Sequence, residues 1–179
     1  MHQYEVTFAG FGGQGILAIG QILAKACMDA GKHVVWIPSY GPEMRGGTAY
    51  CTVVISDRDI GSPIISNPTC AAVLNRPSFD KFSPKVKPDG LLLVNSSLID
   101  VKSDRKDIGQ LLVPCNDIAI KSGSARAANM AMLGAFVAQS KVIQTAAVRK
   151  VIEEKFGAKK EVLRINFEAY DQGVALAQA

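Results

Sequence analysis

The sequence is poor in the residues from which catalytic and metal sites are most often built. It has only two histidines, one near the terminus at His2 and one at the start of a β-prone run at His33, so no Ser, His and Asp set is credible. The four cysteines contain no CxxC pair, which excludes the spacing of a zinc or iron–sulfur site. They are Cys27, Cys51, Cys70 and Cys115. We expect buried free thiols, no catalytic residue and no metal site in this chain.

Other absences narrow the class of protein further. No apolar run reaches the ~18 residues that a membrane-spanning helix needs. The first nine residues show no basic segment followed by a hydrophobic one, so nothing indicates a signal peptide. The formal charge of +4 comes from scattered lysines and arginines without interleaved aromatics, unlike a nucleic-acid-binding stripe. We therefore expect a cytoplasmic protein that binds neither membranes nor nucleic acid.

What the sequence has is the composition of a folded domain. Apolar residues make up 48% and charged residues 20% of 179 residues. This length suits one core, because domains commonly hold ~100 to 200 residues. We expect residues 1–179 to form a single domain.

The first thirty-seven residues predict a βαβ unit with a Rossmann-like start. A β-prone run at 4–9 ends in Gly10, a helical pattern covers 16–30 and stops at Gly31, and a second β-prone run covers 33–37 before Pro38. We expect the two strands to pair in parallel through a right-handed crossover.

The rest of the chain continues the alternation of strands and helices. The patterns predict strands at 49–56, 70–75, 90–96 and 111–114, and helices at 77–82, 125–140, 145–156 and 166–177. A short extended piece within 58–65 would form an antiparallel pair and make the sheet mixed. The expected fold is α/β, a three-layer α/β/α sandwich with a mainly parallel, mixed sheet.

The first candidate site is the glycine turn GFGGQG at 10–15, which fits GxGxxG between a strand and a helix. Its cofactor-binding candidates are Gly12, Gly13, Gln14 and Gly15. Glycines let the backbone approach a ligand, and free N–H groups at a helix start favour a phosphate. The alternative is that these glycines serve helix-to-strand packing. No acid follows the second strand to hold a ribose, which argues against an NAD(P)-dependent dehydrogenase.

The second candidate site is the segment that leaves the second strand, at the sheet edge where α/β proteins bind ligands. Its candidates, facing substrate or a partner, are Ser39, Tyr40, Gly41, Pro42, Glu43, Arg45, Gly46 and Gly47. Arg45 can pair with Glu43 or grip a carboxylate or phosphate in bidentate fashion, and Tyr40 offers an aromatic face. The alternative is a surface loop whose charges are only solvated.

A third candidate lies where hydroxyl residues precede an alanine-rich helix. Ser124 is placed to cap that helix. Asn129 is a polar residue on an otherwise small and apolar helix, so its amide either bonds backbone or reaches a ligand.

Together, GFGGQG, PSYGPEMRGGTA and SARAANMAMLGAF resemble the gamma subunit of 2-oxoacid:ferredoxin oxidoreductases over nearly the whole chain. The form of the middle segment looks most like the 2-oxoglutarate enzymes, with pyruvate, branched-chain 2-oxoacid and indolepyruvate enzymes as relatives. The resemblance implies a complex that decarboxylates a 2-oxoacid on thiamine diphosphate, passes electrons to ferredoxin or flavodoxin, and forms an acyl-CoA.

The resemblance also implies where the cofactors lie. Thiamine diphosphate with Mg belongs between alpha and beta subunits, and iron–sulfur clusters belong in beta or delta, so this chain alone binds none of them. Coenzyme A is the co-substrate, and the two glycine-bearing segments would face it or the partner subunits. The isolated chain would be inactive and could form homodimers through its apolar docking surface. The alternative function is a stand-alone nucleotide-binding domain without oxidoreductase partners.

Overall fold

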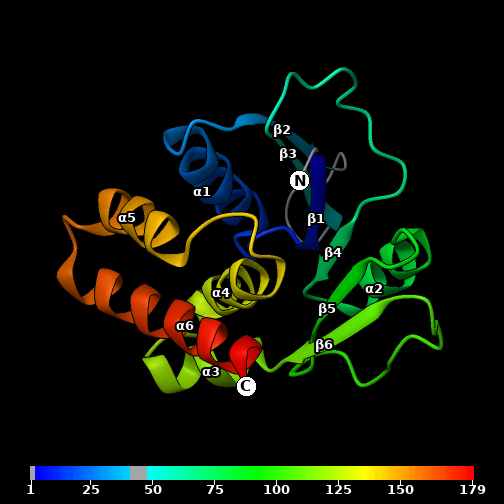
Figure 1. Cartoon of the computed structure of the whole chain (residues 1–179). Helices are drawn as coiled ribbons and strands as arrows, with labels where there is room; N and C mark the ends of the chain where they lie inside the picture. Colours follow the sequence, from blue (N-terminus) through cyan, green and yellow to red (C-terminus); the bar gives the residue numbers. More distant parts are fainter. Residues whose placement is uncertain (1–2, 41–47) are drawn as a thin grey trace.

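The computed structural model describes residues 3–40 and 48–179. These residues form a six-stranded sheet and six α-helices (Figure 1). The strands are β1 (Gln3–Phe11), β2 (His33–Tyr40), β3 (Thr48–Ser56), β4 (Cys70–Val73), β5 (Leu91–Asn95) and β6 (Gly109–Val113). The helices are α1 (Ile16–Asp29), α2 (Arg76–Phe82), α3 (Cys115–Ser122), α4 (Ala128–Ser140), α5 (Thr145–Phe156) and α6 (Lys160–Gln178).

The sheet is mixed, as predicted, but for a different reason. Its strand order is β2-β3-β1-β4-β5-β6, and β3 is antiparallel to both β1 and β2. Strand β3 thus separates the two strands that we expected to pair in parallel, because it pairs with β1 over nine positions from Gln3↔Ser56 to Phe11↔Thr48. The expected extended piece at 58–65 is irregular and joins no strand.

The two faces of the sheet are covered unequally. Side chains alternate along each strand, so Val6 and Phe8 of β1 face the larger core, which contains buried residues of α1, α3, α4, α5 and α6. On the other face, Ala9 packs in a smaller core with Phe79 and Phe82 of α2. The fold is therefore a three-layer α/β/α arrangement with one thick and one thin helical layer.

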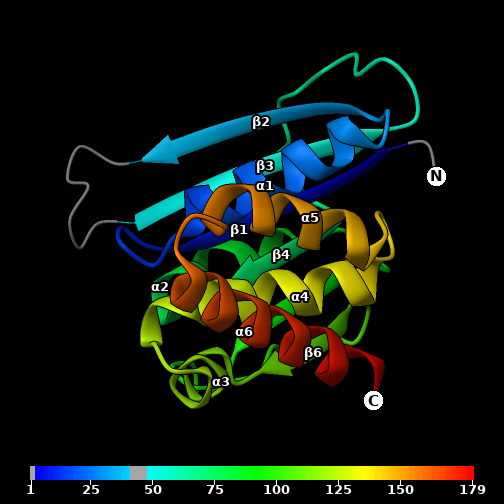
Figure 2. The ribbon, with the colours of Figure 1, turned by 90° about the vertical axis from the view of Figure 1, so that its left-hand side faces the viewer.

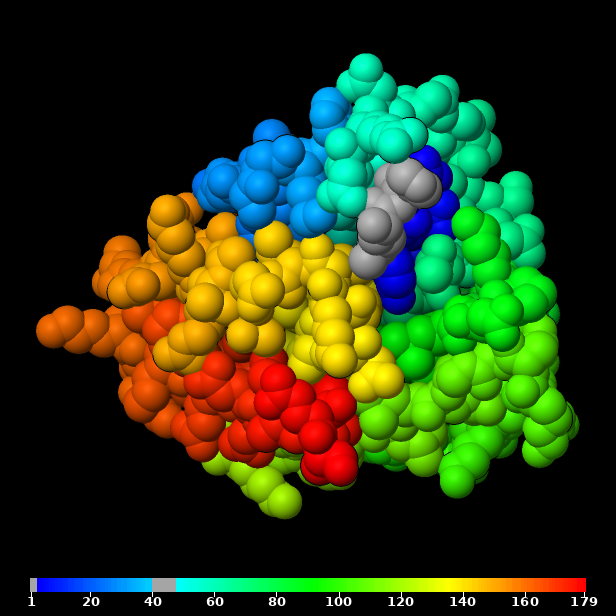
Figure 3. Space-filling model, in the orientation of Figure 1, coloured from blue at the N-terminus to red at the C-terminus, as the bar shows by residue number. Residues whose placement is uncertain are grey.

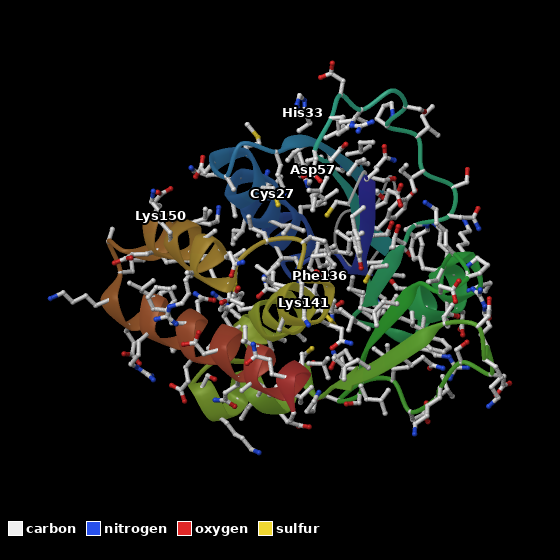
Figure 4. The ribbon with its side chains drawn as sticks, viewed as in Figure 1. Cys27, His33, Asp57, Phe136, Lys141 and Lys150 are labelled. Carbon is white, nitrogen blue, oxygen red and sulfur yellow. The ribbon has the colours of Figure 1, made fainter. Side chains whose placement is uncertain are left out.

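Helix α4 lies at the centre of the thick layer. Its Phe136 ring meets Phe8 at 5.5 Å and Tyr4 at 6.0 Å between centroids, both edge-on, and Figure 4 shows Phe136 beside β1. Helix α4 also crosses α6 closely, since a Cβ on Gly134 would lie 2.1 Å from the Tyr170 carbonyl oxygen, and one on Gly173 would lie 2.1 Å from that of Ala131. The two glycines let the backbones touch.

The space-filling view in Figure 3 shows the resulting surface, with α5 and α6 (orange to red) on one side and β4 to β6 (green) on the other. Most predicted elements match the structure within a few residues, and α5 has the predicted bounds. Helix α3 was not predicted, and α6 begins six residues earlier than expected. None of the described helices combines the length and apolar character that a membrane span requires.

The topology brings several connections to one edge of the sheet. Strands β1 and β2 end where β3 begins, since Phe11 pairs with Thr48 and Tyr40 pairs with Ala49. Figure 2 shows the turn after β1 beside the tip of β2 and the start of β3, with the start of β1 at the opposite end of the sheet. This is the edge at which the sequence placed its candidate site.

Candidate functional site

The glycine turn is closed by its own glutamine. The Phe11 N–H donates to Gln14 Oε1 at 2.6 Å, and the Gln14 N–H donates to the Phe11 carbonyl oxygen at 3.1 Å. A Cβ at Gly10 would lie 2.5 Å from Gln14 Oε1, so the absence of a side chain at Gly10 makes this closure possible. At this point the glycine serves packing, and the Gln14 oxygen is bound within the turn.

Gly15 connects the turn to α1 and to a distant helix. It is the N-cap of α1 and adopts the left-handed conformation, with φ of 73°. Asn129 Nδ2, on α4, donates to the Gly15 carbonyl oxygen at 3.1 Å. A Cβ at Gly15 would lie 2.2 Å from that Nδ2 atom. The first and third candidate sites of the sequence therefore meet, through a hydrogen bond from the Asn129 side chain to backbone.

The start of α1 has the electrostatic character of an anion site. No side chain caps the helix, and its first turn has no acidic residue. The first N–H groups of an α-helix lack intrahelical acceptors and carry a partial positive charge. Asn129 is 5% exposed, and its Oδ1 has no hydrogen-bond partner among the described residues. Unused donors and one unused acceptor thus adjoin the same turn.

The second candidate segment is described only at its ends. Strand β2 runs through Pro38 to Tyr40, so Ser39, expected in a loop, is a strand residue paired with Tyr50. Pro38 is tolerated because β2 is an edge strand. The remaining candidates, and the Tyr40 side chain, lie outside the described residues: Gly41, Pro42, Glu43, Arg45, Gly46 and Gly47. The positions that flank them lie at the same edge as the glycine turn.

Sequence reasoning missed Phe11. It ends β1 between Gly10 and Gly12, and 39% of its surface is exposed, unlike the buried β1 residues Val6 and Phe8. The only signal available was an aromatic side chain inside a glycine turn, where no core pattern accounts for it. An exposed ring at this edge offers a flat apolar contact to a partner or ligand.

The four cysteines are buried and free, as predicted, and the Cys51 thiol donates to the carbonyl oxygen of Ile16 at the start of α1 at 3.5 Å. Burial raises the pKa of the Cys27 thiol to about 11 and that of Cys51 to about 12, against an ordinary 9.0. It also raises the pKa of Cys70 and Cys115. None of the thiols therefore supplies a thiolate near neutral pH. Within residues 3–40 and 48–179, no three His, Cys, Asp or Glu side chains are grouped to hold a metal ion.

Ser124 caps the segment before α4, as the sequence predicted. Its hydroxyl accepts the Arg126 N–H at 3.3 Å and starts a short 3-10 turn, Ala125–Ala127, that leads directly into α4. The cap thus positions the helix start from which Asn129 reaches Gly15.

Comparison with known proteins agrees with this fold. Residues 5–176 match the family model described as pyruvate ferredoxin/flavodoxin oxidoreductase. The ketoisovalerate oxidoreductase subunit VorA of Methanothermobacter marburgensis is 37% identical over 177 residues, which cover 98% of this chain and 37% of that protein. The chain thus spans little more than a third of that curated relative.

Two solved structures share the fold. The gamma subunit of a keto/oxoacid ferredoxin oxidoreductase from Geobacter sulfurreducens superposes with a TM-score of 0.84 at 31% identity, covering 98% of both chains. A 2-oxoglutarate:ferredoxin oxidoreductase from Magnetococcus marinus, solved with 2-oxoglutarate, coenzyme A and succinyl-CoA bound, superposes with a TM-score of 0.91 at 28% identity, covering 99% of this chain and 31% of that one. The chain belongs to the pyruvate ferredoxin/flavodoxin oxidoreductase family.

Proposed function

We propose that residues 1–179 form one gamma-type domain that works as a subunit of a 2-oxoacid:ferredoxin or flavodoxin oxidoreductase. In this role the chain assembles with alpha and beta subunits, and with a delta subunit where the complex has one. The likeness to the Geobacter gamma subunit supports the proposal most strongly, because it extends over 98% of both chains. Family membership also favours it over a stand-alone nucleotide-binding domain.

The catalysed reaction belongs to the assembled complex. There, thiamine diphosphate with Mg supplies the decarboxylation chemistry, and iron–sulfur clusters carry electrons toward the acceptor. The described part of this chain contributes no thiol with a lowered pKa and no grouped metal ligands. Its contribution is to shape the entrance to the active site, and the isolated chain is inactive.

We further propose that the edge formed by the glycine turn and the segment after β2 faces coenzyme A or a partner subunit. Coenzyme A carries phosphates, which suit the uncapped start of α1, free of acidic side chains in its first turn. Arg45, in the adjoining segment, would add a bidentate phosphate contact. The Magnetococcus relative binds coenzyme A, which supports this ligand class for the shared domain.

The proposed substrate is 2-oxoglutarate, which the complex converts to succinyl-CoA. The Magnetococcus structure contains both of these compounds. The relative named as a ketoisovalerate oxidoreductase subunit supports the idea that related domains serve more than one 2-oxoacid. Substrate choice therefore rests with the partner subunits, and a steady-state assay of the purified complex with both 2-oxoacids tests it.

Purification from the native source tests the subunit role. We expect the untagged chain to co-elute with larger subunits, thiamine diphosphate and iron. Elution of this chain alone, with none of these present, would contradict the proposal and support the stand-alone domain.

Titration calorimetry of the assembled complex tests the ligand role. We expect Arg45→Ala to weaken coenzyme A binding by about tenfold or more, the loss expected for one charge-assisted contact. Arg58→Ala is the matched control, because Arg58 follows β3 at the opposite end of that strand. Unchanged coenzyme A affinity in Arg45→Ala would leave this edge with a role in subunit contacts only.

A further inference from the structure

A polar pocket lies on the opposite face of the sheet from α1. It has a volume of about 390 Å³, and its lining includes Thr7, Tyr50, Thr52, Lys81, Phe82 and Lys85. Phe82 belongs to the smaller core under α2, and Tyr50 packs against that core, whereas α1 belongs to the larger core. The pocket is therefore separate from the glycine turn, and its capacity to bind a ligand does not depend on the proposed subunit role.

Two lysines bring positive charge to this pocket and are held there by aromatic rings. Lys81 Nζ lies 4.6 Å from the Tyr50 ring centroid and 5.3 Å from that of Phe82. Lys85 Nζ lies 5.8 Å from the Phe82 centroid. The two rings pack edge-on at 5.0 Å. Both ammonium groups thus lie within 6 Å of the Phe82 ring centroid, and both lysines line the same pocket.

No carboxylate in the described part of the chain neutralises the charge of these two lysines. Neither Lys81 nor Lys85 forms an ion pair with a carboxylate there, whereas the neighbouring Lys87 pairs with Glu5 at 2.8 Å. Glu5 lies on the same face of β1, two residues before Thr7, and its charge is offset by Lys87 together with hydrogen bonds from Gln3 and Thr69. The pocket therefore has an excess of positive charge.

The pocket floor supplies a buried hydrogen-bond donor. Thr7 Oγ1 and Thr52 Oγ1 lie 3.0 Å apart on the paired strands β1 and β3, and the two residues are 3% and 8% exposed. Two hydroxyl groups carry two hydrogens, and their mutual bond uses one. The second hydrogen remains available to an acceptor in the pocket, where Ser66 and Asn67 add exposed polar groups.

We propose that this pocket binds a phosphate dianion, either free or at the end of a small metabolite. Two ammonium groups that line one pocket, beside the same Phe82 ring, suit a ligand that carries two negative charges on one group. The threonine hydroxyl and the amide of Asn67 donate to the remaining phosphate oxygens. Tyr50 and Phe82 hold the lysines in place, which reduces the side-chain entropy lost on binding.

Calorimetric titration of the full chain with inorganic phosphate, at constant ionic strength, tests the site. We expect saturable binding at one site, and we expect Lys81→Gln and Lys85→Gln each to weaken it by about fivefold or more. Amide NMR should place the shift changes at Tyr50 and Thr52. Both lysines are exposed, so the variants should keep the wild-type unfolding midpoint.

The matched control is Lys150→Gln, which removes the same charge from α5, far from α2 (Figure 4). It should leave phosphate affinity unchanged. Equal weakening by Lys150→Gln and Lys81→Gln would mean that phosphate responds only to net charge, and the proposal would fail. It would fail as well if the wild-type chain showed no saturable phosphate binding.

Discussion

The amide of Asn129 is hydrogen-bonded to the carbonyl oxygen of Gly15, across 114 residues of sequence, at 3.1 Å. This contact ties the start of α4 to the start of α1, so the glycine turn is held by a helix in the middle of the thick layer. Two side chains thus hold the turn: Gln14, which belongs to it, and Asn129, which belongs to α4. A site preorganised in this way loses less entropy when it binds.

Substituting Gly15 should destabilise the protein more than substituting Gly13. Both have positive φ, 73° and 98°, which costs a residue with a Cβ about 1 kcal/mol or more. A Cβ at Gly15 would also strike Asn129, whereas one at Gly13 meets nothing within 4 Å. We expect urea unfolding to give a loss of about 2–4 kcal/mol for Gly15→Ala and about 1 kcal/mol for Gly13→Ala.

The double variant Gly15→Ala/Asn129→Ala separates strain from the clash. It should be more stable than the sum of the two single losses predicts, because removing the amide relieves the contact with the new Cβ. If the losses in unfolding free energy of the two single variants add up to that of the double variant, Asn129 is not what excludes a side chain at position 15.

Phe11→Ala should affect assembly and leave folding almost unchanged. The ring is 39% exposed at the end of β1, so its removal leaves no large cavity. We expect a change of less than about 1 kcal/mol in unfolding free energy, together with weaker binding to the partner subunits or to coenzyme A in the complex. Phe8→Ala, at a buried position of the same strand, is the contrasting variant and should lose about 3–5 kcal/mol. Wild-type assembly and coenzyme A affinity in Phe11→Ala would assign no binding role to the ring.

Glu5 should make stability depend on acid pH. Burial alone would raise its pKa, but hydrogen bonds from Lys87, Thr69 and Gln3 outweigh burial and hold the pKa below the ordinary 4.5. Its contribution is therefore complete above pH 4.5 and is lost as the pH falls through the lowered folded value. The difference in unfolding free energy between wild type and Glu5→Gln, measured with urea, should therefore shrink as the pH falls below 4.5.

Glu153→Gln provides the control for this measurement, since Glu153 is exposed on α5. It should follow the wild-type pH profile. A constant difference between wild type and Glu5→Gln from neutral pH down to pH values well below 4.5 would refute the linkage.

The thiols should be unreactive in the folded protein. All four are buried, and burial raises the pKa of Cys27 to about 11 and of Cys51 to about 12. We expect a chromogenic disulfide reagent at about pH 8 to label none of them rapidly and to label all four after denaturation. Rapid labelling of one thiol in the native chain would reveal an opening that the structure does not contain.

The order of strands and helices along the chain was largely predictable from the sequence. The pairing of each strand with its neighbours in the sheet was not. A continuous apolar run such as Cys70–Val73 marks a buried strand whatever its partner. The apolar pattern of β3 is equally compatible with parallel and antiparallel pairing, so its place between β1 and β2 could not be inferred. Helix α3 was missed because it has only eight residues, and its first residue, Cys115, is followed by the polar Asn116 and Asp117.

The candidate site was predictable to a similar degree. The sequence predicted that the glycine turn and the end of β2 lie at the same edge of the sheet, because both follow the carboxyl ends of strands, where α/β proteins bind ligands. The contact between Asn129 and Gly15 could not be foreseen, because no local pattern reports a hydrogen bond between distant segments. The exposure of Phe11 had one local signal, an aromatic side chain inside a glycine turn.

Strands β2 and β3 pair antiparallel as far as Tyr40 and Ala49. The segment that connects them therefore leaves and re-enters the sheet at neighbouring positions. The entropy of closing such a segment rises only slowly with its length. Substituting it with the corresponding segment of another family member, longer or shorter, would therefore change the closure entropy little. The antiparallel pair makes this edge suitable for segment exchange, and the effect of an exchange on the proposed coenzyme A and subunit contacts can be measured without rebuilding the fold.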